Sequence, residues 1–157
     1  MIKTCLIIAV VCLSAGKVVA QPSAVKFTEL NGLQKKQSKL VLVLIGTDWC
    51  KYCKAMEQSL KSDKQIGGIL KASFYPVFLN AEETSEIVFA GRRFKFKPTG
   101  TNTGVNELAE QLGTLNGQLT FPTLCFLNSE NEIIYQHQGY LNSSSLMLLL
   151  NKLIQSR

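Results

Sequence analysis

Continuous apolar runs and helix-periodic stretches outline the structural elements of this chain. Residues 40–46 (Leu-Val-Leu-Val-Leu-Ile-Gly) and residues 74–79 carry no charged side chain, which is typical of strands covered on both faces of a sheet. Between them, residues 50–62 place apolar side chains every three to four positions, which predicts a helix with one buried face. A shorter helix is predicted over residues 63–71.

The C-terminal half predicts a helix, two strands and a closing helix. Their expected bounds are 105–112, 123–127, 132–136 and 143–154, and a polar helix over 28–38 precedes the first strand. The order is therefore β–α–β, then a helix, then β–β–α. This order predicts a single α/β domain.

Residues 81–103 form an insertion into that order. Ile87–Phe89 and Phe94–Phe96, on either side of Gly91, predict a small β-hairpin, followed by a loop with proline and glycine. Basic side chains alternate with phenylalanines in this segment, which indicates a strand with one solvent face. These basic residues are Arg92, Arg93, Lys95 and Lys97. The acidic run of Glu82, Glu83 and Glu86 is interpreted as a solvated face.

Residues 1–20 have the parts of a secretory signal peptide: a basic start, an apolar segment and small residues before Ala20. We expect cleavage after Ala20, which leaves 21–157 as one domain of a periplasmic or secreted protein. An uncleaved anchor is the alternative, although the apolar segment is short for a membrane span. Cleavage also removes Cys5 and Cys12.

Charge changes this picture little. The net charge is +6 at pH 7, and removal of Lys3 and Lys17 with the signal peptide lowers it by two. Because an exported protein rarely meets nucleic acid, no nucleic-acid partner is expected.

Trp49-Cys50-Lys51-Tyr52-Cys53 is the candidate reactive motif, and it lies between the first strand and the helix that follows. The spacing of three residues places both sulfurs on one face of the first helical turn. The unpaired N–H groups and positive dipole end of that helix stabilise a thiolate at Cys50. Cys50 is therefore the expected nucleophile, and Cys53 the residue that resolves a mixed disulfide.

The same pair of cysteines also occurs in zinc sites and in structural disulfides. Zinc needs four ligands, whereas the mature chain adds only Cys125 and His137, neither at metal-like spacing. We therefore expect no metal site and no bound cofactor. Cys125 lies within a predicted strand and is interpreted as a buried, unreactive thiol.

The motif, together with Phe121-Pro122-Thr123 and Gly139-Tyr140, resembles the thioredoxin superfamily over about residues 39–154. This resemblance implies a thioredoxin-like fold: a central mixed sheet of four to five strands, flanked by helices. The chain looks most like exported bacterial thioredoxin-like proteins of the Bacteroidetes type. That likeness rests on the Asp-Trp-Cys-x-x-Cys start, the Phe-x-Gly…Phe-x-Phe insertion and the aromatic-Pro-Thr segment.

The resemblance also implies roles for the residues around the cysteines. Pro122 is expected to have a cis peptide bond and to lie across from Cys50, with the backbone before it free to pair with a substrate strand. A trans proline at a strand start is the alternative. A redox-active disulfide is expected between Cys50 and Cys53. The predicted substrate-binding residues are Trp49, Lys51, Tyr52, Phe121, Pro122 and Thr123.

Two departures from the thioredoxin pattern bear on the redox chemistry. Cytoplasmic thioredoxins carry a buried acid six residues before the first cysteine, and this chain has Leu44 there. Asp48 is expected to be more exposed and is not assumed to replace that acid. Lys51 places a cation near Cys50, which should lower the pKa of that thiol and make the disulfide more oxidising.

The sequence therefore predicts an exported thiol–disulfide oxidoreductase that acts as a monomer on protein thiols and disulfides. The reductase direction is favoured over oxidation, and a periplasmic reductant implies a membrane protein as electron donor. Two alternatives stay open. One is a redox-inactive module that binds extended peptides, and the less favoured one is a copper chaperone, since soft thiolates suit Cu(I).

Overall fold

The computed structural model describes residues 23–156, and the predicted signal peptide therefore lies outside the described residues. The elements are α1 (Phe27–Lys36), β1 (Leu40–Gly46), α2 (Lys51–Ser62), α3 (Lys64–Ser73), β2 (Phe74–Asn80), β3 (Ile87–Phe89), β4 (Arg92–Phe94), β5 (Phe96–Pro98), β6 (Gly104–Asn106), α4 (Glu107–Gly113), β7 (Thr114–Leu115), β8 (Gln118–Leu119), β9 (Thr123–Leu127), β10 (Ile133–Gln138) and α5 (Ser143–Gln155). Within residues 23–156, no helix has the length and apolarity needed to cross a bilayer.

A four-stranded mixed sheet organises the domain, in the order β10-β9-β1-β2. β1 and β2 are parallel, and they are joined by the crossover through α2 and α3 that parallel strands require. β9 runs antiparallel to both β1 and β10. All seven residues of β1 are buried, as its unbroken apolar run predicted.

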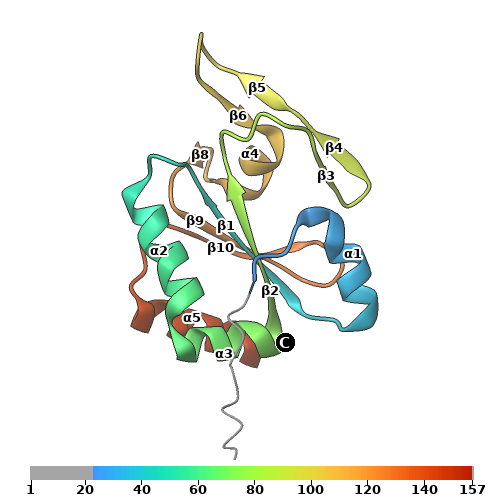
Figure 1. The fold of residues 1–157 in the computed structure, drawn as a ribbon, viewed down its shortest axis with the longest axis vertical. Helices are drawn as coiled ribbons and strands as arrows, with labels where there is room; N and C mark the ends of the chain where they lie inside the picture. The colour runs from blue at the N-terminus through green and yellow to red at the C-terminus, as the bar shows by residue number, and fades with distance from the viewer. Residues whose placement is uncertain (1–22, 157) are drawn as a thin grey trace, which may run out of the picture.

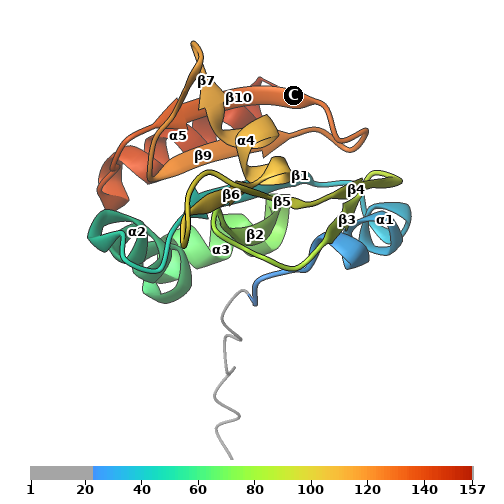
Figure 2. The same cartoon turned by 90° about the horizontal axis from the view of Figure 1, so that it is seen from above.

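Two hydrophobic layers cover the sheet because alternate side chains of β1 point to opposite faces. Val41, Val43 and Ile45 pack with α1, α4 and the β3–β4 hairpin. Leu40, Leu42 and Leu44 face the other layer, built from α2, α3 and α5. Figures 1 and 2 show the sheet between these two sets of helices, so the predicted α/β architecture is confirmed.

The insertion is more regular than the sequence pattern predicted. The basic segment is not one strand: β4 ends at Phe94 and pairs with β3, while β5 begins at Phe96 and pairs with β6. The residues around Gly104 therefore form a second hairpin instead of a loop and helix start. Gly104 is required there because an added Cβ would lie 2.2 Å from the Phe96 ring.

Asn106 fixes this second hairpin to the rest of the domain. Its side chain is fully buried and caps α4 by accepting a hydrogen bond from the Leu108 N–H. Its amide also donates to the carbonyl oxygens of Glu83 and Ser85, at 3.1 and 3.3 Å. Helix α4 consequently begins at Glu107, two residues later than the sequence pattern predicted.

Candidate active site

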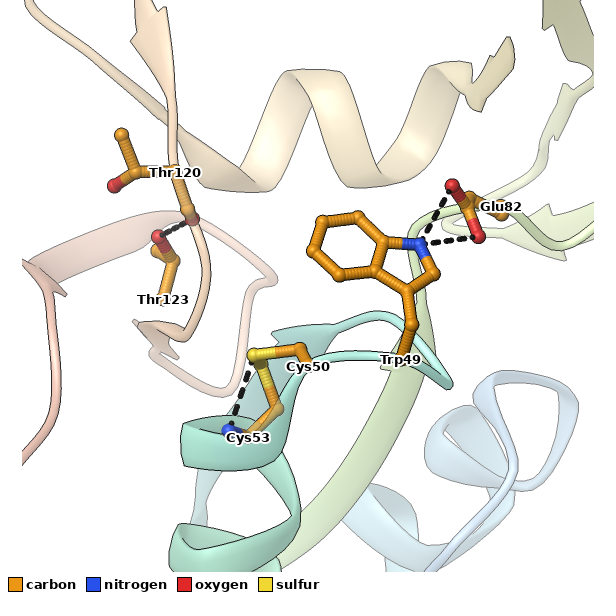
Figure 3. The surroundings of a disulfide bond; sticks show 6 residues. All are labelled: Trp49, Cys50, Cys53, Glu82, Thr120 and Thr123. Carbon is orange, nitrogen blue, oxygen red and sulfur yellow. Dashed lines mark hydrogen bonds between the residues drawn. A yellow bond between two sulfur atoms is a disulfide. The ribbon is translucent and has the colours of Figure 1, made fainter. Parts of the chain in front are cut away.

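The two cysteines lie where the chain leaves β1 and enters α2. Cys50 is the N-cap residue of α2, and its Sγ accepts a hydrogen bond from the Cys53 N–H at 3.1 Å. The Cys50 N–H in turn donates to the Thr47 carbonyl oxygen at 3.2 Å. Cys50 and Cys53 form a disulfide with a Cα–Cα distance of 5.3 Å, drawn in Figure 3. The first turn of α2 therefore directs a backbone donor at the Cys50 sulfur, which favours its thiolate once the disulfide is reduced.

Both cysteines are buried, and Cys53 packs against the end of β1. It is 5% exposed, and Gly46 at the end of β1 approaches it closely. A Cβ placed on Gly46 would lie 2.7 Å from both the Cβ and the Sγ of Cys53. The helix start can pack this closely on the strand end only because residue 46 has no side chain.

Trp49 is an exposed residue next to the disulfide. Its indole is 70% exposed, and Nε1 donates to both carboxylate oxygens of Glu82 at 3.1 Å (Figure 3). The ring also makes an edge contact with Phe121, with centroids 6.4 Å apart. Glu82 is thus a hydrogen-bond partner of the reactive loop, whereas the sequence assigned it to a solvated acidic face.

The expected cis peptide bond is present between Phe121 and Pro122. The Pro122 carbonyl oxygen accepts a hydrogen bond from the Gly139 N–H at 2.8 Å, which holds the loop before α5 beside this segment. That loop brings Tyr140 to Tyr52, with ring centroids 5.5 Å apart. The three motifs that carried the resemblance are therefore linked to one another in space.

The predicted substrate-binding residues differ in accessibility. Trp49, Lys51 and Tyr52 are exposed, and Phe121 is half-buried. Pro122 and Thr123 are buried, and the Thr123 hydroxyl donates to the Thr120 carbonyl oxygen at 2.7 Å. The exposed side chains beside the disulfide are thus aromatic or cationic. Thr123 is instead a buried residue whose hydrogen bond to Thr120 stabilises the start of β9.

A family model for the thioredoxin-like domain matches residues 27–154. The chain belongs to this family. Its match spans every helix and strand of the described structure except the last residue of α5.

Solved structures share the fold of this thioredoxin-like domain at low sequence identity. A thioredoxin from Thermus thermophilus is 18% identical, with a TM-score of 0.59 over 86% of this chain and 88% of that chain. A disulphide isomerase from Xylella fastidiosa is 17% identical, with a TM-score of 0.56 over 81% and 87%. A thioredoxin-fold protein from Helicobacter pylori is 21% identical, with a TM-score of 0.56 over 73% and 68%. A search of curated proteins finds no match.

The environment of the disulfide differs from the thioredoxin pattern as the sequence indicated. Leu44 is buried, so β1 contributes no carboxylate at that position. Asp48 is exposed on the loop and accepts a hydrogen bond from the Asn80 side-chain amide at 3.2 Å. Among residues 23–156, no group of three or more His, Cys, Asp or Glu side chains is placed to hold a metal ion.

Sequence reasoning missed two features near this site. The contact between Glu82 and Trp49 was missed because it depends on the register of β1 and β2, which pairs Gly46 with Asn80. The β7–β8 hairpin before the cis proline was also missed. Its signal was the Asn116-Gly117 pair, whose φ angles of 53° and 76° are those of a tight hairpin turn.

Cys125 lies in β9, the strand beside β1, and is a free thiol. Burial raises the pKa of this thiol from 9.0 to about 12. The side chain is fully buried, so it is inaccessible to a protein substrate in the folded state. This position agrees with an unreactive packing role.

Alkaline pH is expected to destabilise the protein through Cys125. Because its pKa is higher in the folded state, Cys125 adds stability that is fully present below pH 9.0 and is lost as the pH rises towards about 12. At about pH 10 the loss is roughly 1.4 kcal/mol relative to about pH 7. Urea unfolding of the wild type and Cys125→Ala should show their stability difference shrinking with pH. A pH-independent difference would contradict the assigned cause.

Proposed function

We propose that this thioredoxin-like domain is an exported thiol–disulfide oxidoreductase whose redox centre is Cys50 and Cys53. The observation that carries the proposal is the disulfide at the N-cap of α2, with the Cys53 N–H directed at the Cys50 sulfur. The exposed Trp49, Lys51 and Tyr52 beside it offer a surface for a protein substrate. Export and the Bacteroidetes-type affinity belong to the proposal and rest on the sequence alone.

In the reductive direction, the reaction begins with the Cys50 thiolate. It attacks one sulfur of a substrate disulfide, so that a mixed disulfide forms and the other substrate sulfur leaves as a thiolate. Cys53 then loses its proton and attacks the Cys50 sulfur. This second step releases the reduced substrate and closes the Cys50–Cys53 disulfide. Oxidation of a substrate dithiol is the reverse sequence.

The reductase direction requires a supply of electrons. In a periplasmic or secreted setting, a membrane protein would have to reduce the Cys50–Cys53 disulfide after each turnover, and protein thiols and disulfides would be the other partners. We expect the domain to act as a monomer with no bound cofactor. The exposed Lys51 favours the Cys50 thiolate and so acts in the opposite sense, towards a more oxidising pair.

A redox titration of the mature chain tests this function. The protein would be equilibrated in glutathione or dithiothreitol buffers, and its thiols counted by alkylation while Trp49 fluorescence is followed. A reversible two-electron couple is expected. A potential near roughly −270 mV would indicate a reductant, and one of about −180 to −120 mV an isomerase or oxidant. Absence of any reversible couple would refute the proposal and favour a peptide-binding module.

A further inference from the structure

An open cavity of about 250 Å³ is lined in part by Cys53. Its apolar wall comes from the ends of β1 and β2, including Leu44 and Phe78. Its polar wall comes from the loop after β1 and from the first turns of α2. Cys53 is one of the residues that line this cavity, so water in the cavity can take up its thiol proton.

Thr47 contributes to the polar wall of the cavity. Thr47 lines it and is 5% exposed, and the Thr47 Oγ1 is buried with no hydrogen-bond partner among residues 23–156. A buried hydroxyl in native proteins is normally hydrogen-bonded, often to an ordered water. The volume of the cavity accommodates several waters, which can reach the polar groups exposed in it.

A carboxylate lies on the same wall. Glu57 follows Cys53 by four residues on α2, so both side chains are on one face of the helix, and both line the cavity. Glu57 is half-buried and forms an ion pair with Lys61, one turn further along. The carboxylate that lines the cavity is therefore also the ion-pair partner of Lys61.

We propose that Glu57 is the proton acceptor for Cys53, acting through water in this cavity. This inference rests on the proposed oxidoreductase function. It assigns to Glu57 the acceptance of the Cys53 proton, since the side chain of Leu44 has no acid group. Leu44 lies in β1, whereas Glu57 lies in α2. The proton of Cys53 is therefore accepted by a residue of its own helix.

Resolution of the mixed disulfide transfers one proton and exchanges one disulfide bond for another. In the mixed disulfide, the Cys53 thiol gives its proton to water, and that water gives one to the Glu57 carboxylate. The Cys53 thiolate then attacks the Cys50 sulfur, the bond from Cys50 to the substrate sulfur breaks, and the substrate leaves as a thiolate. Cys50 and Cys53 end as a disulfide, and protonated Glu57 returns its proton to solvent.

Two other charged residues, Asp48 and Lys54, line the cavity. Asp48 lines it from the loop but accepts a hydrogen bond from Asn80, and Lys54 lines it from α2. The residues that β1 and β2 contribute to the lining are uncharged: Leu44, Gly46, Phe78, Leu79 and Asn80. Asp48 is therefore the rival acceptor.

The experiment follows one turnover of the reduced protein with an aromatic disulfide, dithiobis-nitrobenzoate, in stopped flow. Each exchange step releases one coloured thiolate, so a first phase reports attack by Cys50 and a second phase reports resolution by Cys53. In Glu57→Gln, the second phase should be about tenfold slower near neutral pH, with the first phase unchanged. The deficit should shrink as the pH rises, because hydroxide then removes the thiol proton directly.

Matched variants identify the cause of any effect. Glu110→Gln removes a carboxylate that pairs with Lys97 at 2.7 Å, outside the cavity, and should leave both phases unchanged. An unchanged second phase in Glu57→Gln, or slowing only in Asp48→Asn, would overturn the assignment. Absence of the first phase in the wild type would instead refute the proposed function.

Discussion

Replacing Cys50 with serine is expected to lower the rate of disulfide exchange on the order of a thousandfold or more, while the domain stays folded. A serine hydroxyl is not ionised at neutral pH, whereas Cys50 at the N-cap of α2 receives the Cys53 N–H and the positive end of the helix dipole. The substitution therefore slows the nucleophilic attack of residue 50 on the substrate disulfide. Reduction of insulin by dithiothreitol, with and without the protein, measures it, and circular dichroism verifies the fold.

Cys53→Ser is the matched variant for this prediction. It keeps the nucleophile and removes the resolving thiol, so a mixed disulfide between Cys50 and a substrate should accumulate. Mass spectrometry of alkylated extracts would detect that adduct and name the partner. If Cys50→Ser instead kept the full biological activity of the protein, the cysteines would be a static disulfide and the peptide-binding module would replace the enzyme.

The second large effect is expected at Gly46. Gly46→Ala places a Cβ 2.7 Å from the Cβ and Sγ of Cys53, and the disulfide to Cys50 restricts how far Cys53 can move. The start of α2 has to shift away from β1, which should cost about 2 kcal/mol of unfolding free energy. The same shift displaces the Cys53 sulfur and should slow resolution of the mixed disulfide. Urea unfolding of the oxidised protein measures the first effect.

Gly68→Ala is the control with the opposite expected sign. Gly68 lies inside α3, and an added Cβ there meets nothing within 4 Å. Alanine at this site restricts the unfolded chain and favours the helix, so a gain of about 0.5–1 kcal/mol is expected. Equal stability of the two alanine variants would show that the approach of Gly46 to Cys53 does not limit packing.

Much of the fold could be predicted because its main elements are specified by local pattern. β1 was predicted with its observed bounds, since an unbroken apolar run of this length is typical of a strand covered on both faces. The position of the cysteines at a strand-to-helix junction followed from the same pattern. The cis Phe121–Pro122 bond was implied by the resemblance to thioredoxins and is present.

Short strands could not be predicted in the same way. β5 and β6 have three residues each, too few for a periodic signal, and they exist because they pair with each other and because the Phe96 ring lies on Gly104. Such pairing depends on contacts across a loop. A sequence window treats the same residues as irregular chain.

The sequence by itself determined the order of the main elements and the position of Cys50 and Cys53 at the start of a helix, because both depend on neighbours within a few turns of chain. The tertiary structure decided what surrounds the pair. The parallel register of β1 and β2 sets Gly46 beside Asn80, and so brings Glu82 to Trp49. The packing of α2 beside the ends of β1 and β2 forms a cavity lined by Cys53 together with Thr47 and Glu57. These contacts join separate elements, and no local pattern specifies them.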